Sequence, residues 1–153
     1  MSDNEVNLNE MRKQALLDLA NANSNSAERF IYVTFQREGI HCYPEAATDP
    51  KLQDVSFLAS PHRHIFHFKV EIQVYHNDRE IEFIQFKRYL ESLFNQGVLD
   101  LNNKSCEMIA DELYISIITK YPMRKVTITV SEDNENGATI FYPNNTTYQR
   151  SVR

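Results

Sequence analysis

One segment of twelve residues constrains the fold more than any other part of this sequence. From His64 to Tyr75, apolar and polar residues alternate almost without exception. Strand side chains point alternately to the two faces of a sheet, so the pattern predicts a strand with one buried and one mostly polar face. His64 opens the apolar row that runs through Phe66 to Val74.

The other elements follow from periodicity and from turn residues. Strands are expected at residues 30–35, 80–83, 126–132 and 138–142, and helices at 6–22, 84–95 and 105–120. Residues 38–61 contain three prolines and little periodicity, so they are expected to form an irregular loop, and a loop of that length is usually functional. This order of elements predicts an α+β domain with an antiparallel sheet.

The chain of 153 residues suits one domain with short extensions. We expect a helical extension and linker at residues 1–28, the folded domain at 29–143 and a tail at 144–153. The first helix has two interpretations: a loosely attached amphipathic helix, or a docking helix for an oligomer or partner.

Composition and charge narrow the function classes. Hydrophobic residues make up 42% of the chain, which is enough for a packed core. The net charge of −5 argues against general nucleic-acid binding, because such proteins carry a basic surplus or stripe. No apolar run approaches the roughly 20 residues that span a bilayer, so no membrane association is expected. An acidic N-terminus without a signal-peptide pattern and only two cysteines indicate a cytoplasmic, reduced protein.

Three histidines form a candidate metal site. His62 and His64 are two residues apart on a predicted strand, so their side chains leave the same face about 7 Å apart. The irregular segment returns to this strand and carries His41 as the third candidate, whereas His67 points to the opposite face. Zinc commonly takes three protein ligands. The alternative is that the pair is simply solvated or hydrogen-bonded.

Glu132 is unusual because it ends the core-facing row of the strand at residues 126–132. It lies either just beyond the edge of the sheet or in a position to bind something. A buried carboxylate needs partners, and the N–H groups of a heterocyclic base would provide them.

Taken in order, several segments resemble the 6-pyruvoyl-tetrahydropterin synthase and 6-carboxytetrahydropterin synthase family. The resemblance covers about residues 30–142 and rests on short motifs: His41-Cys42-Tyr43-Pro44 after the first strand, His62-Arg63-His64 at the start of the next, Glu80 to Lys87, Leu99 to Asn102, Lys104 to Ala110, and Val130-Ser131-Glu132-Asp133. The family has the tunnelling fold. The resemblance therefore implies a four-stranded antiparallel sheet with two helices on one face, after an N-terminal helical extension.

The resemblance also implies roles for individual residues. His41, His62 and His64 would bind Zn²⁺, and Glu132 would hold the 2-amino-pyrimidinone edge of a pterin or purine-like ligand. Glu107 would join that ligand-binding set. Family members assemble from trimers, often into hexamers, so a homo-oligomer is implied as well.

Departures from the family pattern put catalysis in doubt. Leu58 replaces the family's proton-transferring Cys, and Leu101 replaces the His of its Asp-His pair, which leaves Asp100 alone. Asp100 and Cys42 are the remaining catalytic candidates, although Cys42 is expected to point away from the His41 side chain.

Two further residues have open interpretations. Arg63 stands where the family has Gly, and it either contacts a ligand phosphate or lies on the outer face. Cys106 is interpreted as a small residue under a helix start.

Three functions remain open from the sequence. The first is a zinc-dependent lyase of the family type, acting on dihydroneopterin triphosphate or a related compound. The second is a pterin-, purine- or nucleotide-binding protein that keeps the pocket without the proton-transfer groups. The third is an oligomeric structural or interaction module.

Overall fold

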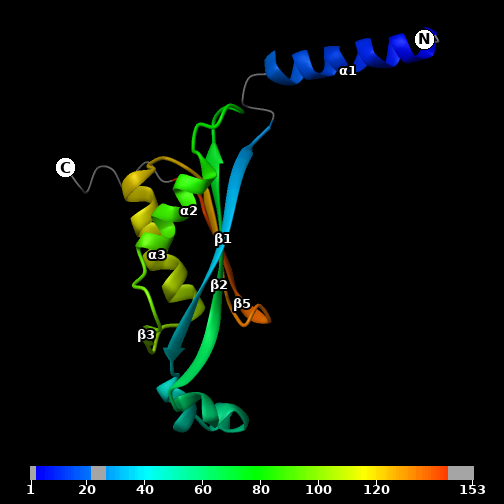
Figure 1. The fold of residues 1–153 in the computed structure, drawn as a ribbon. Helices are drawn as coiled ribbons and strands as arrows, with labels where there is room; N and C mark the ends of the chain where they lie inside the picture. Colours follow the sequence, from blue (N-terminus) through cyan, green and yellow to red (C-terminus); the bar gives the residue numbers. More distant parts are fainter. Residues whose placement is uncertain (1–2, 22–26, 145–153) are drawn as a thin grey trace.

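The computed structural model describes residues 3–21 and 27–144 (Figure 1). In chain order its elements are α1 (Asp3–Asn21), β1 (Arg29–His41), the 3₁₀ helices η1 (Pro44–Ala47) and η2 (Pro50–Ala59), β2 (His62–Val74), α2 (Phe83–Ser92), β3 (Leu99–Asn102), α3 (Cys106–Lys120), β4 (Val126–Glu132) and β5 (Asn136–Tyr142). The predicted linker and tail extend into residues 22–26 and 145–153, which lie outside the described residues.

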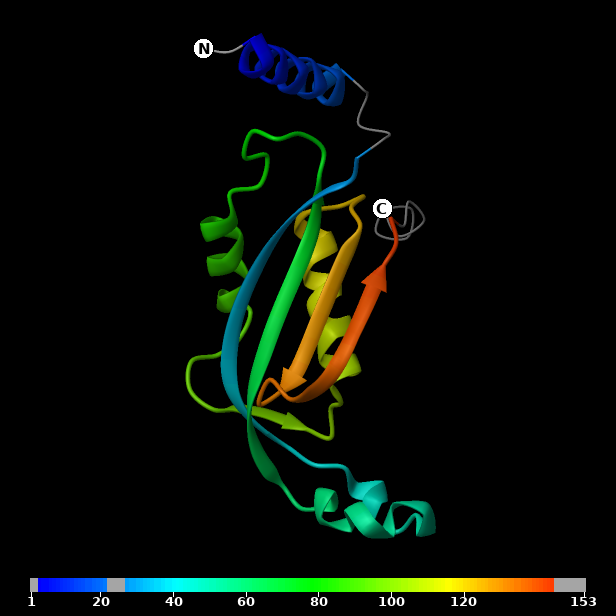
Figure 2. The same ribbon diagram turned by 90° about the vertical axis from the view of Figure 1, so that its right-hand side faces the viewer.

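The strands form one sheet in the order β3-β1-β2-β4-β5. β1, β2, β4 and β5 are antiparallel, which confirms the α+β class (Figure 2). The predicted four-stranded sheet is incomplete, because the short β3 adds a fifth strand that runs parallel to β1. Leu99 to Asn102 alternate between buried apolar and exposed polar residues, a pattern that the sequence argument did not use, and β3 pairs with Gly39 and Ile40 of β1.

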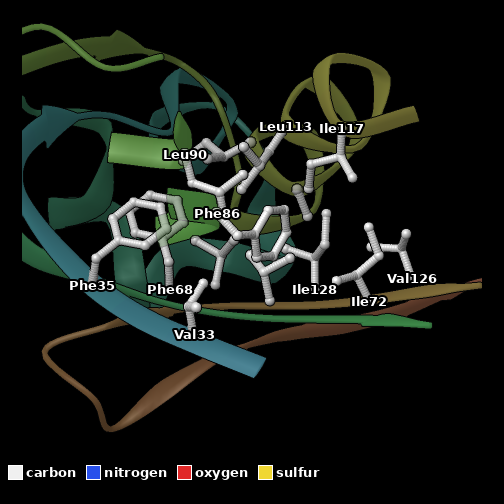
Figure 3. Close-up of a cluster of buried hydrophobic side chains, with 14 of the residues drawn as sticks. Val33, Phe35, Phe68, Ile72, Phe86, Leu90, Leu113, Ile117, Val126 and Ile128 are labelled. Carbon is white, nitrogen blue, oxygen red and sulfur yellow. The ribbon is translucent and has the colours of Figure 1, made fainter. Parts of the chain in front are cut away.

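Helices α2 and α3 cover the same face of the sheet (Figure 1). Phe86 and Leu90 of α2 are fully buried, and so is Ile117 of α3. They pack on the apolar rows of the strands, shown in Figure 3, of which Val70, Ile72, Val126 and Ile128 are fully buried. The predicted alternation therefore defines the core face, and the core lies between this face and the two helices.

The predicted strand at residues 80–83 is wrong. The Glu82 carboxylate accepts hydrogen bonds from the backbone N–H groups of Ile84 and Gln85, so it caps a helix that begins at Phe83. Ser105 caps α3 in the same way, because its side chain accepts a hydrogen bond from the Met108 N–H. This start agrees with the predicted helix at residues 105–120. Capping side chains therefore decide both helix starts.

The segment at residues 38–61 is more ordered than predicted. β1 continues to His41, and two 3₁₀ helices follow, each with a proline in its first turn. Asp49 caps the second by accepting from the Lys51 N–H. Proline suits the first turn of a helix because its fixed φ is already helical and its missing N–H would have no partner there.

The first helix carries its apolar side chains on the outside. Leu8, Met11, Leu16, Leu17 and Leu19 of α1 are all exposed. Within residues 3–21 and 27–144, no helix has both the length and the apolar character needed to cross a bilayer.

Candidate metal centre and adjoining pocket

Pairing between β1 and β2 brings three histidines together at the end of these strands that leads into the 3₁₀ helices. Figure 2 shows this end of the two strands, with the 3₁₀ segment beyond it. His41 and His62 are direct partners in the antiparallel register, and His64 lies opposite Gly39. All three continue the buried rows of their strands, next to Phe66, so their side chains leave the helix-covered face. Strand register therefore assembles the triad that the sequence predicts.

The imidazole rings are close enough to share one ion. The ring centroid of His41 lies 4.7 Å from that of His62 and 5.3 Å from that of His64, and the last two are 5.0 Å apart. One ring nitrogen from each lies within 4.8 Å of the others. His41 is buried, whereas His62 and His64 are partly exposed. His67 is not part of this cluster, as its place on the opposite face predicts.

Each histidine contacts an oxygen acceptor through Nδ1. The partners are the Lys104 carbonyl for His41 at 3.0 Å, the Ser60 carbonyl for His62 at 2.8 Å and the Asp133 carboxylate for His64 at 2.7 Å. These oxygens accept hydrogen bonds, so each Nδ1 carries a proton and donates it. In a neutral imidazole the lone pair is then on Nε2, which is the tautomer held ready for a metal ion.

The Glu132 carboxylate lies against the histidines. Glu132 pairs with Phe66 across β4 and β2 and continues the core-facing row of β4. Its Oε1 lies 3.1 Å from His41 Nε2, and its Oε2 lies 3.5 Å from His64 Nε2. Both Nε2 atoms are buried and have no hydrogen-bond partner among the described residues. Buried polar atoms of this kind need a partner, and a cation would satisfy the nitrogens and the carboxylate together.

Asp133 is a site residue that the sequence argument did not identify. It accepts a hydrogen bond from the Ile65 N–H at 2.9 Å through Oδ1 and holds His64 through Oδ2. The Ile65 N–H and then the His64 side chain keep the pKa of Asp133 below its ordinary value, so the group is a carboxylate at neutral pH. Its φ of 52° is left-handed, a conformation that Asp adopts more readily than most residues. The sequence feature that could have identified Asp133 is the polar turn that follows Glu132.

A pocket of about 480 Å³ adjoins the histidines. Its volume is typical of small-molecule sites. The walls come from the end of β1, the 3₁₀ segment, the start of α3 and the β4–β5 turn, and they include His41, Cys42, Tyr43, Leu58, His62, Lys104, Ser105, Cys106, Glu107 and Glu132. The pocket therefore joins the candidate metal ligands to both apolar and hydrogen-bonding groups.

The two cysteines of the pocket differ in reactivity. Burial, reinforced by the charges of Glu132 and Glu107, raises the pKa of the Cys106 thiol to about 11. Cys106 is therefore a small buried residue, as interpreted from the sequence, and not a nucleophile at neutral pH. Cys42 is partly exposed and lines the pocket even though strict alternation would turn it away, because β1 ends at His41.

Two candidate residues lie outside this pocket. Arg63 is exposed on the outer face, where its Nε lies 3.1 Å from Glu38 Oε1. Asp100 is exposed on β3, and its Oδ1 accepts a hydrogen bond from the Asn102 N–H at 3.3 Å. A ligand in the pocket therefore meets neither side chain in this arrangement.

The donor set fits zinc. Three imidazoles offer nitrogen ligands of the kind that Zn²⁺ accepts, and the neighbouring Glu132 carboxylate favours a cation there. The hydrogen bonds from Nδ1 to carbonyl and carboxylate oxygens are the outer contacts that orient histidine ligands in metal sites.

Comparisons with known proteins support the fold. No protein-family model matches the chain, and no curated protein matches its sequence. Among solved structures, the chain is similar to 6-pyruvoyl tetrahydropterin synthase of Caenorhabditis elegans, with a TM-score of 0.55 and 11% sequence identity. The match covers 76% of this chain and 96% of that chain. This protein therefore has an α+β fold like that of the synthase, and its chemistry has to be argued from its own residues.

Proposed function

We propose that this protein binds a zinc ion through His41, His62 and His64 and holds a small heterocycle of the pterin or purine type beside it. The observation that carries the proposal is that all three histidines contact oxygen acceptors through Nδ1 while one ring nitrogen of each lies within 4.8 Å of the others. Bound zinc would supply a Lewis acid that polarises ligand oxygens. The protein's part is to orient the imidazoles and to shape the pocket.

The pocket supports a flat heterocycle with N–H donors. Tyr43 and Leu58 provide apolar surface, whereas Glu107 and Ser105 provide hydrogen-bonding groups from the start of α3. Glu132 is the second carboxylate on this pocket. The similarity of the fold to a pterin synthase supports the same class of ligand.

Binding is favoured over the lyase reaction. Leu58, which the resemblance aligns with a proton-transferring Cys, lies in the pocket wall, and an alkyl side chain moves no proton. Leu101, aligned with the missing His, is buried in the core. A pocket that keeps its metal ligands and lacks these two groups suits ligand capture.

A zinc-dependent lyase acting on dihydroneopterin triphosphate or a related compound is the second candidate. The observation that favours it is Cys42, because this partly exposed thiol lines the pocket directly after His41. A thiolate there would be a base, the role that Leu58 cannot fill.

We also propose a homo-oligomer built from trimers. The face of the sheet opposite the helices exposes large apolar side chains, which include Tyr32, Ile65 and Phe141. Exposed apolar side chains on one face of a sheet support a contact surface between chains. The mass of the protein in solution tests this proposal.

The direct test is calorimetric titration of the chelator-treated protein with zinc, followed by titration with neopterin and guanosine. We expect one zinc per chain and a heterocycle affinity that disappears when zinc is removed. Incubation of the zinc-loaded protein with dihydroneopterin triphosphate is expected to give no product. Product formation by the wild type that is lost in Cys42→Ala would establish the lyase instead, and absence of zinc binding would overturn both candidates.

A further inference from the structure

We infer that the face of the sheet opposite α2 and α3 carries a second binding site, which takes the phosphoryl group of a phosphorylated small molecule. The two helices leave this face uncovered (Figure 1). A second pocket, of about 660 Å³, extends over it, and its volume is typical of small-molecule sites. Its walls come from β1, β2, α2, β4 and the β4–β5 turn, so it is separate from the pocket beside the histidines.

The strand register places polar side chains side by side in this pocket. Two rows cross β1, β2 and β4 with one residue from each strand: Thr34-Lys69-Thr129 and Gln36-His67-Ser131. These residues alternate with the buried rows, so their side chains leave the uncovered face. Directly opposite residues have Cβ atoms about 5 Å apart, and the rows are about 7 Å apart along the strands. Six polar side chains therefore lie within about 10 by 7 Å.

Most of these side chains have unused hydrogen-bonding groups. Four of the six make no hydrogen bond with another described residue: Thr34, Gln36, His67 and Ser131. Thr129 is bonded to Thr139 on β5, with 2.9 Å between the two hydroxyl oxygens. Hydroxyl and amide groups commonly hold phosphate oxygens together with Lys and Arg. The two rows therefore offer several donors to one ligand group.

Charge at the second pocket favours an anion, although the whole chain has a net charge of −5. β3 pairs with β1 only at residues 39–41, so the earlier part of β1 has a free edge. The pocket continues round this edge, where Arg37 and Lys87 add to the charge of Lys69 and Glu91 is the one carboxylate of the lining. Lys87 is exposed and forms no ion pair with a described residue. The Arg37–Glu91 ion pair is long, at 3.9 Å.

The neighbouring carboxylate Glu71 does not cancel the charge of Lys69. Its Oε1 lies 3.6 Å from Lys69 Nζ, and both side chains reach solvent. Ion pairs of this kind contribute little and break easily. The long, flexible side chain of Lys69 can therefore turn to a ligand in the pocket.

The donors and charges together select a phosphoryl group. Such a group has three acceptor oxygens and nearly two negative charges, which suits several donors and more than one basic side chain. The acidic chain disfavours a nucleic-acid backbone, because binding of such a polymer depends on a basic surface. A phosphorylated small molecule is therefore the ligand that fits the pocket.

Apolar residues border the two polar rows. Tyr32 and Phe141 lie in the next row on one side, and Ile65 lies beyond the other. The oligomer contact proposed above would use these apolar side chains. The polar rows between them stay available to a ligand.

The test is calorimetric titration of the full chain with sodium triphosphate, after metal has been removed with chelator. We expect one triphosphate per chain, with an affinity that falls as ionic strength rises. Lys69→Met is expected to lower the affinity about 10-fold, because a cationic donor is lost. Ser131→Ala, which removes one hydroxyl, is expected to lower it about 3-fold. Lys13→Met removes an exposed charge from α1 and is the matched control, with the affinity of the wild type.

The outcomes separate this inference from the proposed metal site. No triphosphate binding by the wild type, or equal affinities in the wild type and Lys69→Met, would overturn the inference. An equal loss in Lys13→Met would overturn it too, because it would show an effect of net charge alone. His62→Ala is expected to bind triphosphate as the wild type does, and a loss there would assign the anion to the histidine pocket. Zinc titration of the same samples tests the metal site independently, and circular dichroism establishes that each variant is folded.

Discussion

Two carboxylates at opposite ends of the same sheet differ in what balances their charge. At the end of β2 beyond Val74, the Oε1 atom of Glu80 lies 2.6 Å from Arg124 Nη2. Arg124 also donates to the Gln73 carbonyl at 2.8 Å, and its guanidinium lies 4.8 Å from the centroid of the Tyr75 ring. This end of the sheet has a permanent cation of its own.

At the other end, Glu132 faces the Nε2 atoms of His41 and His64, which have no hydrogen-bond partner among the described residues. Glu80 is next to an arginine, which is itself a cation. Glu132 is next to histidines, which are common ligands of cations. This difference supports the proposal that the histidine end binds a cation from outside the chain. Substitutions at each end of the sheet test this difference.

His62→Ala is expected to have the largest effect, because it removes a metal ligand. At a free zinc concentration 1,000 times the Kd, binding stabilises the native state of the wild type by about 4 kcal/mol. The variant is expected to lose most of that stabilisation, while its stability in chelator stays close to that of the wild type. Urea denaturation with and without zinc measures both quantities.

His67→Ala is the matched control, since His67 lies on the same strand with its side chain on the opposite face. It is expected to keep the full stabilisation by zinc. Equal zinc responses in the two variants would contradict the assignment of the site to His41, His62 and His64.

Arg124→Met is expected to destabilise the protein by about 2 kcal/mol with or without zinc, because Glu80 would lose its charged partner in a mostly buried place. Arg79→Met is the control: it removes an ion pair with Asp78 in which both side chains are largely exposed, and should cost less than about 1 kcal/mol. Urea denaturation of both variants in chelator compares them. A zinc-dependent cost of Arg124→Met would show that the two ends of the sheet are not independent.

The loss of unfolding free energy caused by Arg124→Met is expected to depend on pH. The hydrogen bond from Arg124 is the main reason that the pKa of Glu80 lies below its ordinary value of 4.5. A depressed folded-state pKa contributes stability that is present above the unfolded pKa and is lost as pH falls through the folded pKa. The difference in unfolding free energy between wild type and variant should therefore be constant near pH 7 and shrink below about pH 4.5. A difference that persists unchanged to pH 3 would contradict this account of the ion pair.

Much of the site could be predicted because it depends on strand periodicity. Alternation places His62, His64 and Glu132 on the core face, and the register of β1 against β2 then adds His41. The acceptors for Nδ1 could not be predicted in this way. Two of them are backbone carbonyls outside the strands, and the third, Asp133, depends on a left-handed turn.

The errors in the predicted fold have local causes. Residues 80–83 were expected to form a strand, but the side chain of Glu82 takes the N–H groups that begin α2. The alternation of β3 spans only four residues, and this strand pairs with β1, which is distant in sequence. Periodicity thus describes long elements, whereas caps and nonlocal pairing decide the short ones.

The smallest effect concerns the two cysteines beside the candidate metal centre. With a pKa of about 11, only about one Cys106 thiol in a thousand is ionised at pH 8, so alkylation there is expected to be slow. Cys42, which is partly exposed, is expected to react first. Mass spectrometry of peptides after brief iodoacetamide treatment measures the order, and preferential labelling of Cys106 would contradict the predicted burial.

The central claim is that the histidine end of the sheet takes a cation from outside. The most direct test is a calorimetric titration with zinc, performed in parallel on the chelator-treated wild type and on His62→Ala. The account predicts one zinc per chain for the wild type and none for the variant at the same concentrations. A wild type that binds no zinc, or a variant that binds it equally well, would contradict the claim.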